Sequence, residues 1–428
     1  MALRVVIIND FSSGGGGAAA LATLSARELV RRGVDVLFIA GDDATLSSEL
    51  DVGSGATVPT LSLRGKSLLE SPVAGIVTGL FDIRARNTIG EWVQSNDTPE
   101  TVYHLHNWSQ ILSPAIFSAL RAVRHRVVLH AHDFFLTCPN GAYANYQEGT
   151  ACELNPLSPR CLVTNCDRRS YAQKLWRVAR QAVVRGIQEL GWRGVPIIAL
   201  HEGMVPLLAR AGVPVSSIKV LRNPVVPFSP SRVRAEANRE FAFVGRLHHG
   251  KGPDLAAEAA KRAGVPLRFV GDGPLRSALE HGYPAFPISG WCDRSAVSRM
   301  LGGARALVMP SRYPEPFGLV ALEALWSGLP VIIAKTALLA NEIKEREAGL
   351  SVDPTNVAAF AEVLSQINQS DRVVEQMSMR AYTDCRELAT TTDEWIDGLL
   401  ETYASVLEKQ ASNGTVVRRD APDRTARL

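Results

Sequence analysis

The 428-residue sequence contains no apolar run that approaches the ~20 residues of a membrane-spanning helix. Its opening, MALRVVIIND, passes from a short apolar run straight into a Gly-rich turn, without the long apolar core and cleavage site of a secretory signal. An excess of one charge is also missing, because 46 Lys and Arg stand against 43 Asp and Glu, for a net charge of +3. These absences predict a cytoplasmic protein that does not bind nucleic acid.

Cysteine is scarce too, with six residues in the chain, which argues against a disulfide framework. Four of the six fall within 29 residues, at Cys138, Cys152, Cys161 and Cys166. A structural zinc ion bound by these four thiolates is one interpretation, although no C-x-x-C pair is present to begin such a site. Reduced cysteines that pack independently are an equally good interpretation, and disulfides are a weaker third.

One segment is locally basic despite the balanced total. Between residues 160 and 185, seven Lys and Arg residues stand against a single acid, Asp167. The segment is either the solvated face of a helix or a patch that contacts anionic lipid or an acidic acceptor. A peripheral contact with the inner face of a membrane therefore stays open.

Short apolar runs alternate with helical patterns along most of the chain, which predicts an α/β fold with parallel sheets. The expected strands are 4–9, 35–40, 101–106, 126–131 and 196–200, then 241–245, 267–271, 304–310 and 330–334. The Pro-rich stretch 221–240 separates the two series. We expect two doubly wound, Rossmann-like domains that face each other across a cleft. The predicted divisions are a domain over 1–222 with a Cys-rich insertion at about 138–166, a domain over 223–390, a terminal helix over 391–409 that crosses back to the first domain, and a disordered tail over 410–428.

Glycines follow the first strand of each predicted domain. Gly14 to Gly17 precede a helix, where they let the backbone approach an anion at the helix N-terminus. Their spacing is not G-x-G-x-x-G, although Asp42 and Asp43 keep a dinucleotide site open. In the second domain, FVGRLHHGKG places Arg246 and Lys251 in a loop after a strand, which suits a diphosphate. Alternatively, this basic pair forms surface ion pairs with Asp254 or Glu258.

The stretch PEPFGLVALEAL, residues 314–325, places two carboxylates, Glu315 and Glu323, in an otherwise apolar segment. Pro316 forces Glu315 out of the helical region, so we expect it on a loop. A helix should begin near Gly318 and end at about Ser327. The unpaired N–H groups at Phe317, Gly318 and Leu319 would then face an anionic ligand.

Taken in order, these motifs resemble those of the retaining nucleotide-sugar glycosyltransferases of family 4, which have the GT-B fold. The resemblance covers nearly the whole chain, and its most specific part is the E-x7-E segment PSRYPEPFGLVALEALWSGLPVI at 310–332. VGRLHHGKG and VGDGP (270–274) match further donor-domain signatures, and LHAHDFFLTCP (129–139) matches a His-Asp turn on the acceptor side. The resemblance makes 1–222 the acceptor-side domain and 223–390 the domain that binds the nucleotide sugar.

The resemblance also implies roles for individual residues. It places His132 beside the transferred sugar, Glu315 on the hydroxyls of that sugar, and Glu323 on the ribose, with a buried salt bridge as the alternative for Glu323. Arg246 and Lys251 would stabilise the leaving diphosphate. The remaining donor contacts that it implies are Gly16, Gly17, Phe317, Gly318 and Leu319.

These roles imply a retaining hexosyltransferase that moves a sugar from a UDP- or GDP-linked donor to a hydroxyl of a saccharide or lipid-linked acceptor, in cell-envelope polysaccharide or glycolipid synthesis. No catalytic cofactor is expected, because the cationic residues replace a metal and no Asp-x-Asp motif is present. Front-face attack and a short-lived covalent intermediate both stay open. The alternatives are an epimerase or phosphorylase on the same fold, a sugar-binding module without activity, and an NAD-dependent oxidoreductase.

Two positions depart from the family pattern. KTALLANEI at 335–343 stands where relatives have a Gly-rich turn before an acidic residue, so Lys335 or Thr336 would alter the donor contacts. His201 stands where a serine is usual.

Overall fold

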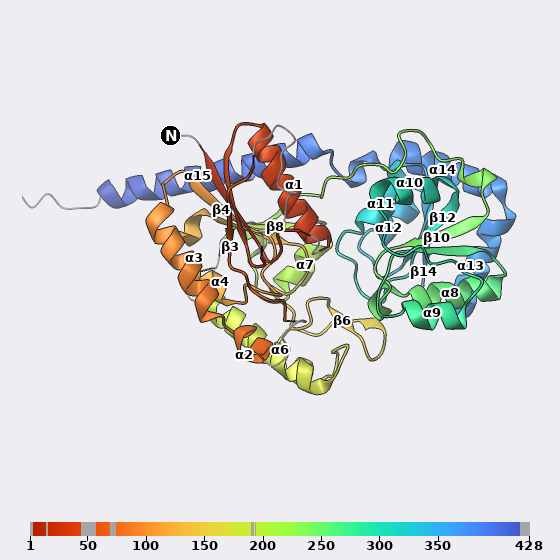
Figure 1. The fold of residues 1–428 in the computed structure, drawn as a ribbon, viewed down its shortest axis with the longest axis horizontal. Coiled ribbons are helices and arrows are strands. Elements are labelled where there is room, and N and C mark those ends of the chain that lie inside the picture. The colour runs from red at the N-terminus through yellow and green to blue at the C-terminus, as the bar shows by residue number, and fades with distance from the viewer. Residues whose placement is uncertain are drawn as a thin grey trace, which may run out of the picture.

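The computed structural model describes residues 3–13, 16–43, 57–68, 74–189, 192 and 194–419. It contains two parallel sheets with helices packed against them, which lie side by side in Figure 1. The predicted α/β architecture with two doubly wound domains is therefore confirmed. Gly14 and Gly15 of the glycine run lie outside the described residues.

The N-terminal sheet has seven strands in the order β3-β2-β1-β4-β5-β8-β9. Its strands are β1 (Arg4–Asn9), β2 (Asp35–Ala40), β3 (Thr60–Ser62), β4 (Thr101–Leu105), β5 (Val127–Ala131), β8 (Ile197–Ala199) and β9 (Ile218–Val220). The direction of winding reverses between β1 and β4, and ligands of doubly wound sheets bind at the carboxyl end of such a switch point. The Gly-rich turn and the histidines after β4 and β5 are located at this end.

The C-terminal sheet has five strands in the order β11-β10-β12-β13-β14. Its strands are β10 (Glu240–Val244), β11 (Leu267–Val270), β12 (Ala304–Met309), β13 (Val331–Ala334) and β14 (Gly349–Val352). A separate antiparallel pair, β6 (Ala144–Asn145) and β7 (Thr150–Ala151), belongs to the Cys-rich insertion. The nine expected strands are all present, whereas the sequence analysis missed β3, β9 and β14.

Most helices pack on the sheets because one face of each is apolar. Those of the N-terminal domain are α1 (Gly17–Arg31), α2 (Ala74–Thr78), α3 (Ile83–Asn96), α4 (Ala115–Ala119), α5 (Pro159–Val163), α6 (Tyr171–Glu189) and α7 (Met204–Ala209), with 3-10 turns η3 (Arg121–Arg126) and η4 (Val215–Ser217). Those of the C-terminal domain are α8 (Pro253–Ala263), α9 (Arg276–Gly282), α10 (Arg294–Gly302), α11 (Leu319–Trp326), α12 (Ala340–Glu345), α13 (Val357–Gln369) and α14 (Asp371–Asp384), with 3-10 turns η5 (Ala235–Ala237), η6 (His249–Lys251) and η7 (Arg386–Leu388).

The last helix, α15 (Thr392–Arg419), returns from the C-terminal domain and runs along the N-terminal one (Figure 1). Trp395, Leu399 and Tyr403 are fully buried in a core shared with β1, β2 and α1. The helix thus lies where the sequence predicts a terminal helix that crosses back to the first domain, and the domain bounds stay predictions. The predicted disorder is wrong for 410–419, where the helix continues, since extending an existing helix costs far less than starting one. Residues 420–428 lie outside the described residues.

The chain crosses between the domains twice, and the two crossings are paired. Pro224 forms a parallel bridge with Thr390, and the N–H of Val225 donates to the Thr390 carbonyl at 2.9 Å. The predicted connector 221–240 thus touches the segment that leads into α15. Any change in the angle between the domains must bend both crossings together.

Candidate active site

A cavity of ≈ 350 Å³ lies between the two domains. The N-terminal domain contributes Gly17 and His132 to its lining, and the C-terminal domain contributes Lys251, Glu315 and the start of α11. Residues that were predicted from separate motifs therefore share one space. The remaining predicted residues Phe317, Gly318 and Leu319 line the same cavity.

Two helix N-termini face each other in this cavity. A Cβ on Gly17, the first residue of α1, would lie 3.5 Å from Cδ1 of Leu319, the first residue of α11. Neither helix has an acidic residue in its first turn. Their capping glycines, Gly16 (φ 93°) and Gly318 (φ 71°), adopt backbone conformations that other residues rarely reach. Unpaired N–H groups and two positive dipole ends thus create a setting for an anion.

Lys251 and Glu315 form an ion pair in the wall of the cavity. The Nζ of Lys251 lies 2.7 Å from both carboxylate oxygens of Glu315, and the Ser311 hydroxyl donates to Oε2 at 3.0 Å. Burial alone would raise the pKa of Glu315, but the Lys251 ammonium and these hydrogen bonds bring it below its ordinary value. Glu315 is therefore a carboxylate at neutral pH and can accept hydrogen bonds from sugar hydroxyls.

The loop that carries Lys251 is fixed by a close backbone contact. Gly252 has φ 71°, and a Cβ at this position would lie 2.2 Å from the carbonyl oxygen of Pro310. Pro310 follows strand β12, which pairs with β10, the strand before the Lys251 loop. The neighbouring strand ends thereby bring together a lysine and a glutamate that are 64 residues apart in sequence.

Three predicted donor residues do not line this cavity, namely Gly16, Glu323 and Arg246. Glu323 lies further along α11 and pairs with Arg294 at 2.8 Å, and burial raises its pKa against the effect of that guanidinium. Glu323 thus forms a salt bridge, but its partner Arg294 is half-exposed, so this is not the buried pair considered as the alternative, and the role of Glu323 on the ribose stays a prediction. Arg246 is exposed; its carbonyl accepts from the His248 N–H at 2.9 Å, but among the described residues its guanidinium has no hydrogen bond or ion pair.

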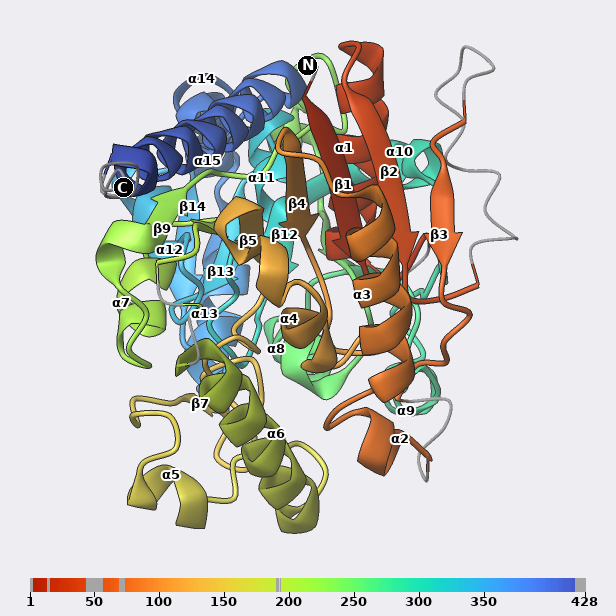
Figure 2. The same cartoon turned by 90° about the vertical axis from the view of Figure 1, so that its left-hand side faces the viewer.

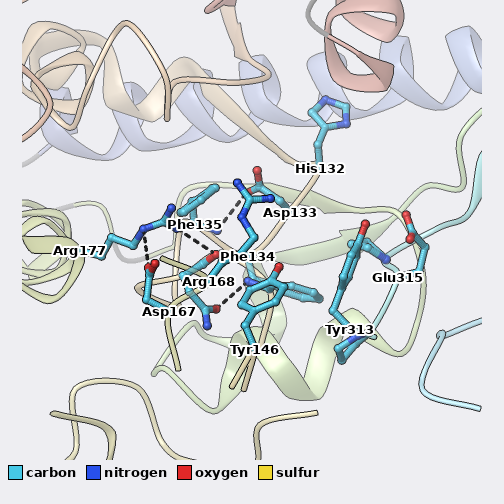
Figure 3. Close-up of a pocket in the computed structure, with 15 residues that line it drawn as sticks. His132, Asp133, Phe134, Phe135, Tyr146, Asp167, Arg168, Arg177, Tyr313 and Glu315 are labelled. Carbon is cyan, nitrogen blue, oxygen red and sulfur yellow. Dashed lines mark hydrogen bonds and ion pairs between the residues drawn. The ribbon is translucent and has the colours of Figure 1, made fainter. Parts of the chain in front are cut away.

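A second cavity of ≈ 300 Å³ adjoins the first. Both are lined by His132, Asp133, Glu315 and Pro316, so they meet at these residues. Figure 3 shows the aromatic and charged side chains around the second cavity, with His132 and Glu315 at its edge. They include Phe135, Tyr146, Tyr313, Asn140, Asp167, Arg168 and Arg177. Aromatic faces with convergent polar groups suit a saccharide.

Asp133 is a site residue whose role could not be predicted from the sequence. Burial raises its pKa to about 6, although the Phe135 N–H donates to its carboxylate at 2.9 Å. The sequence shows it only as the partner of His132 in the His-Asp turn. Tyr146 and Tyr313 were missed altogether, because nothing in the sequence separates a tyrosine of a cavity from one of the core.

Asp133 should make stability depend on pH. Its folded pKa lies above the ordinary 3.8, so the folded state retains a proton longer and loses stability as pH rises from about 4 to 6. The Asp133→Asn variant lacks this loss, so the difference in unfolding free energy between variant and wild type should grow by up to about 3 kcal/mol over that range. Urea unfolding at several pH values measures it, and a difference that is independent of pH contradicts the assignment.

The four clustered cysteines do not gather around one point. No three of their sulfurs lie within 4.8 Å of one another among the residues that the structure describes. Instead, the Nζ of Lys174 lies 3.1 Å from Sγ of Cys166 and 3.5 Å from Sγ of Cys161. The ammonium of Lys174 would repel a zinc ion bound to these sulfurs. This arrangement does not fit tetrahedral zinc, which needs four ligands at about 2.3 Å. Zinc in this insertion remains a prediction for metal analysis.

The two departures from the family pattern meet across the cleft. His201 Nε2 lies 2.9 Å from Glu342, and Arg222 Nη2 contacts the same carboxylate at 2.7 Å. Burial alone would raise the pKa of Glu342, but the hydrogen bonds from His201 and Arg222 lower it to about 2. Glu342 belongs to the C-terminal domain, whereas His201 and Arg222 belong to the N-terminal one. The cluster therefore links the two domains. The sequence marked His201 as unusual without indicating its partner.

Comparison with known proteins agrees with this geometry. The family described as glycosyl transferases group 1 matches residues 228–384. Among solved structures, HepE of Anabaena in complex with UDP superposes with a TM-score of 0.65 at 16% identity, over 95% of this chain and 100% of that one. Sucrose-phosphate synthase of Thermosynechococcus elongatus gives the same values. The chain therefore has the GT-B fold, and its residues 228–384 match the group 1 glycosyl transferase family.

Curated relatives of this GT-B protein include glycogen synthase of Mycobacterium tuberculosis, 31% identical over 285 residues, which are 63% of this chain and 65% of the relative. A GDP-mannose-dependent α-(1-6)-phosphatidylinositol dimannoside mannosyltransferase of the same species is 35% identical over 161 residues, 34% of this chain and 42% of the relative. The chain thus spans less than two thirds of the length of these relatives.

Proposed function

We propose that the protein is a retaining glycosyltransferase of family 4, which transfers a sugar from a UDP- or GDP-linked donor to a hydroxyl of a saccharide or lipid-linked acceptor. The observation that carries the proposal is the meeting of two cavities at His132 and Glu315. One cavity offers helix N-termini and a lysine to a diphosphate. The other offers aromatic rings and polar groups to a second sugar. A transferase needs two such spaces joined at the reacting carbon.

The donor side suits the departure of a nucleoside diphosphate. As the anomeric bond breaks, negative charge grows on the leaving phosphate, and Lys251 with the N–H groups at the start of α11 is placed to stabilise it. Arg246 is exposed beside the same loop and can reach a phosphate as a fork. Glu315 would hold the hydroxyls of the sugar while its carboxylate remains fixed by Lys251 and Ser311.

His132 acts in this proposal as a neutral imidazole. Burial lowers its pKa to about 3, so it carries no charge at neutral pH. A neutral imidazole at the junction of both cavities can accept a hydrogen bond from a sugar hydroxyl. It would position the reacting groups, while the leaving phosphate takes the proton of the acceptor.

Calorimetry with a panel of nucleotides tests the proposal. Binding of UDP or GDP, without binding of NAD, supports it against an oxidoreductase. Incubation of the matching nucleotide sugar with saccharide acceptors, followed by determination of the anomeric configuration of the product, then separates retaining transfer from epimerisation. The proposal fails if no nucleotide binds, or if the sugar is isomerised without transfer.

For a lipid-linked acceptor we propose a docking face on the N-terminal domain. Helices α2, α5 and α6 lie together at one end of this domain in Figure 2, opposite the end where α14 and the start of α15 lie. The Trp176 Nε1–H donates to the carbonyl of Ile76 at 2.8 Å, and the Tyr171 hydroxyl donates to the carbonyl of Leu162 at 3.0 Å. The docking face consists of the exposed apolar residues Ile76, Val77, Val163, Tyr171 and Leu175 and the exposed basic residues Arg160, Arg168 and Arg169.

The chemistry of the docking face matches an anionic bilayer. Apolar side chains can enter the headgroup region while arginines contact lipid phosphates. Arg168 also lines the cavity proposed for the acceptor, so this cavity lies beside the face. None of the described helices is long and apolar enough to cross a membrane.

Val163→Asp should reduce binding to vesicles of phosphatidylglycerol by about tenfold, since a buried apolar contact becomes a charge that the lipid repels. Val163 is 73% exposed, so the fold should tolerate the change. The matched control is Val215→Asp, which alters a 60% exposed valine outside the docking face and should bind as wild type does. Flotation with phosphatidylglycerol and phosphatidylcholine vesicles measures both. Equal binding of the two variants overturns the docking face.

A further inference from the structure

Four histidines at the ends of β4 and β5 form two hydrogen-bonded pairs. His106 Nδ1 lies 2.9 Å from His132 Nε2, and His104 Nε2 lies 3.1 Å from His130 Nδ1. The pairs are stacked, with 4.3 Å between the ring centroids of His130 and His132 and 10° between their planes. Burial lowers the pKa of all four, so each ring is neutral and has one N–H donor and one bare nitrogen.

A shared metal ion is a poor explanation for this group. Nitrogens of His104, His106 and His130 do lie within 4.8 Å of one another. However, the rings of His104 and His106 are stacked on that of His130 at 15° and 28°, so their lone pairs lie in nearly parallel planes and do not converge. The close contact of His104 with His130 is already a hydrogen bond. The question is therefore which nitrogen holds each proton.

Ser25 of α1 determines the proton positions in the first pair, His106 and His132. Its buried hydroxyl donates to the carbonyl of Ala22 at 2.8 Å, which uses its only proton. Its oxygen also lies 3.4 Å from His106 Nε2, where it can only accept. Nε2 of His106 must therefore hold the proton, since two acceptors would otherwise face each other in the core. Nδ1 of His106 is then bare and accepts a hydrogen bond.

The consequence for His132 follows from the same rule. Because His106 Nδ1 accepts, the proton between the rings belongs to Nε2 of His132. Nδ1 of His132 is then bare, and no hydrogen bond to it is found among the described residues. Its ring is partly exposed and lines both cavities.

We propose that Ser25 and His106 are positioning residues that hold His132 in the tautomer with its proton on Nε2, so that Nδ1 is presented as an acceptor to a sugar hydroxyl. The inference rests on the proposed function for its purpose, but the tautomer itself is a property of the free protein. The bare Nδ1 of His132 requires that the ligand group be a hydroxyl that donates a hydrogen bond. The other tautomer would offer an N–H there, which can donate to a hydroxyl oxygen but cannot accept a hydrogen bond from the hydroxyl.

The second pair supplies an internal control. The Tyr403 hydroxyl of α15 lies 2.7 Å from His104 Nδ1. Because the described residues offer this hydroxyl no other acceptor, we infer that it donates to Nδ1, so that His104 holds its proton on Nε2, directed to His130. Tyr403→Phe removes this donor without touching the bond between His106 and His132. The variant should change the tautomer of His104 and leave that of His132 unaltered.

Nitrogen NMR of histidine-labelled protein reads these tautomers directly, without substrate. Wild-type His132 should be a neutral ring with its proton on Nε2 at pH 7. His106→Leu and Ser25→Ala should shift His132 toward a mixture of tautomers, whereas His106→Asn, which retains an acceptor oxygen near the position of Nδ1, should restore the wild-type signal. Thermal unfolding of each variant confirms that it is folded.

Kinetics supply the second measurement. His106→Leu should lower kcat at least about tenfold with little change in the KM for the nucleotide sugar, and His106→Asn should recover much of the loss. A wild-type His132 with its proton on Nδ1, or an unchanged His132 signal in His106→Leu, overturns the inference. If the tautomers are as expected but no sugar is transferred, the proposed function fails and the hydrogen-bond assignment stands.

Discussion

Lys251→Ala is expected to weaken the binding of the nucleotide sugar about 100-fold, or about 2.7 kcal/mol. The ammonium lies in the wall of the cavity beside the N-terminus of α11, where a leaving diphosphate would carry most of the ligand's charge. Loss of a charge-assisted contact in such a partly dry site removes more energy than it would at the surface. Calorimetry with the nucleoside diphosphate and with the intact donor measures the loss.

The ion pair with Glu315 complicates this variant and also provides its control. Without Lys251, Glu315 becomes a buried carboxylate that keeps side-chain hydrogen bonds from Ser311 and Tyr313 but has no cation beside it, which should lower stability as well as affinity. The double variant Lys251→Met with Glu315→Gln removes both charges and should recover stability but not donor binding. Lys261→Ala changes an exposed lysine near the end of α8 in the same domain, which lies over the ring of Tyr283 away from both cavities, and it should bind as wild type does. Wild-type affinity in the double variant would refute a donor role for this pair.

The fold could be predicted largely because each long strand is a buried apolar run bounded by polar residues. β1 and β2 were predicted to the residue from RVVIIN and DVLFIA. β3, β9 and β14 were missed because they are only partly buried and read TLS, IKV and GLSV, whereas β8, which is as short as β3 and β9, is fully buried, reads IIA and was predicted. All three strands also lie at the edge of a sheet, where a strand has one neighbour and needs less apolar surface than a central strand.

The residues of the site and their local structure could be predicted from the sequence, but not which of these residues contact one another. Proline after Glu315 and glycine before α11 predicted a loop carboxylate at a helix start, and both features are present. That Lys251 would bind this carboxylate could not be predicted, because the contact depends on β10 and β12 being neighbours in the sheet. The same holds for His201 and Glu342, which meet only when the two domains come together.

In the sequence, only the Asp133 that follows it distinguishes His132 from His130. The structure supplies a physical reason for the distinction. His130 is buried, with an Nε2 that has no partner, whereas His132 is partly exposed where the two cavities meet. Alternation along a strand places both side chains on the same face, but position at the strand end decides which one reaches the cleft.

His132→Ala is therefore expected to lower kcat by about 100-fold or more, while the affinity for the nucleoside diphosphate changes by less than about threefold. The ring lies where donor and acceptor cavities meet, so its contacts would be to the sugars that react. Lys251 and the start of α11, which would hold the diphosphate, belong to the other domain. Steady-state kinetics with the nucleotide sugar and calorimetry with the nucleoside diphosphate give the two values.

The matched control for this variant lies at the opposite end of the same strand. His125 is exposed just before β5, away from both cavities, so His125→Ala should leave kcat and affinity unchanged. His132→Ala also leaves His106 Nδ1 without its donor, and thermal unfolding separates any loss of stability from the loss of turnover. An equal decline in turnover and nucleotide affinity would place His132 on the phosphates. A fall in kcat alone would place it on the reacting sugars, because a contact that matters only as the bond breaks leaves the affinity for the product nucleotide untouched.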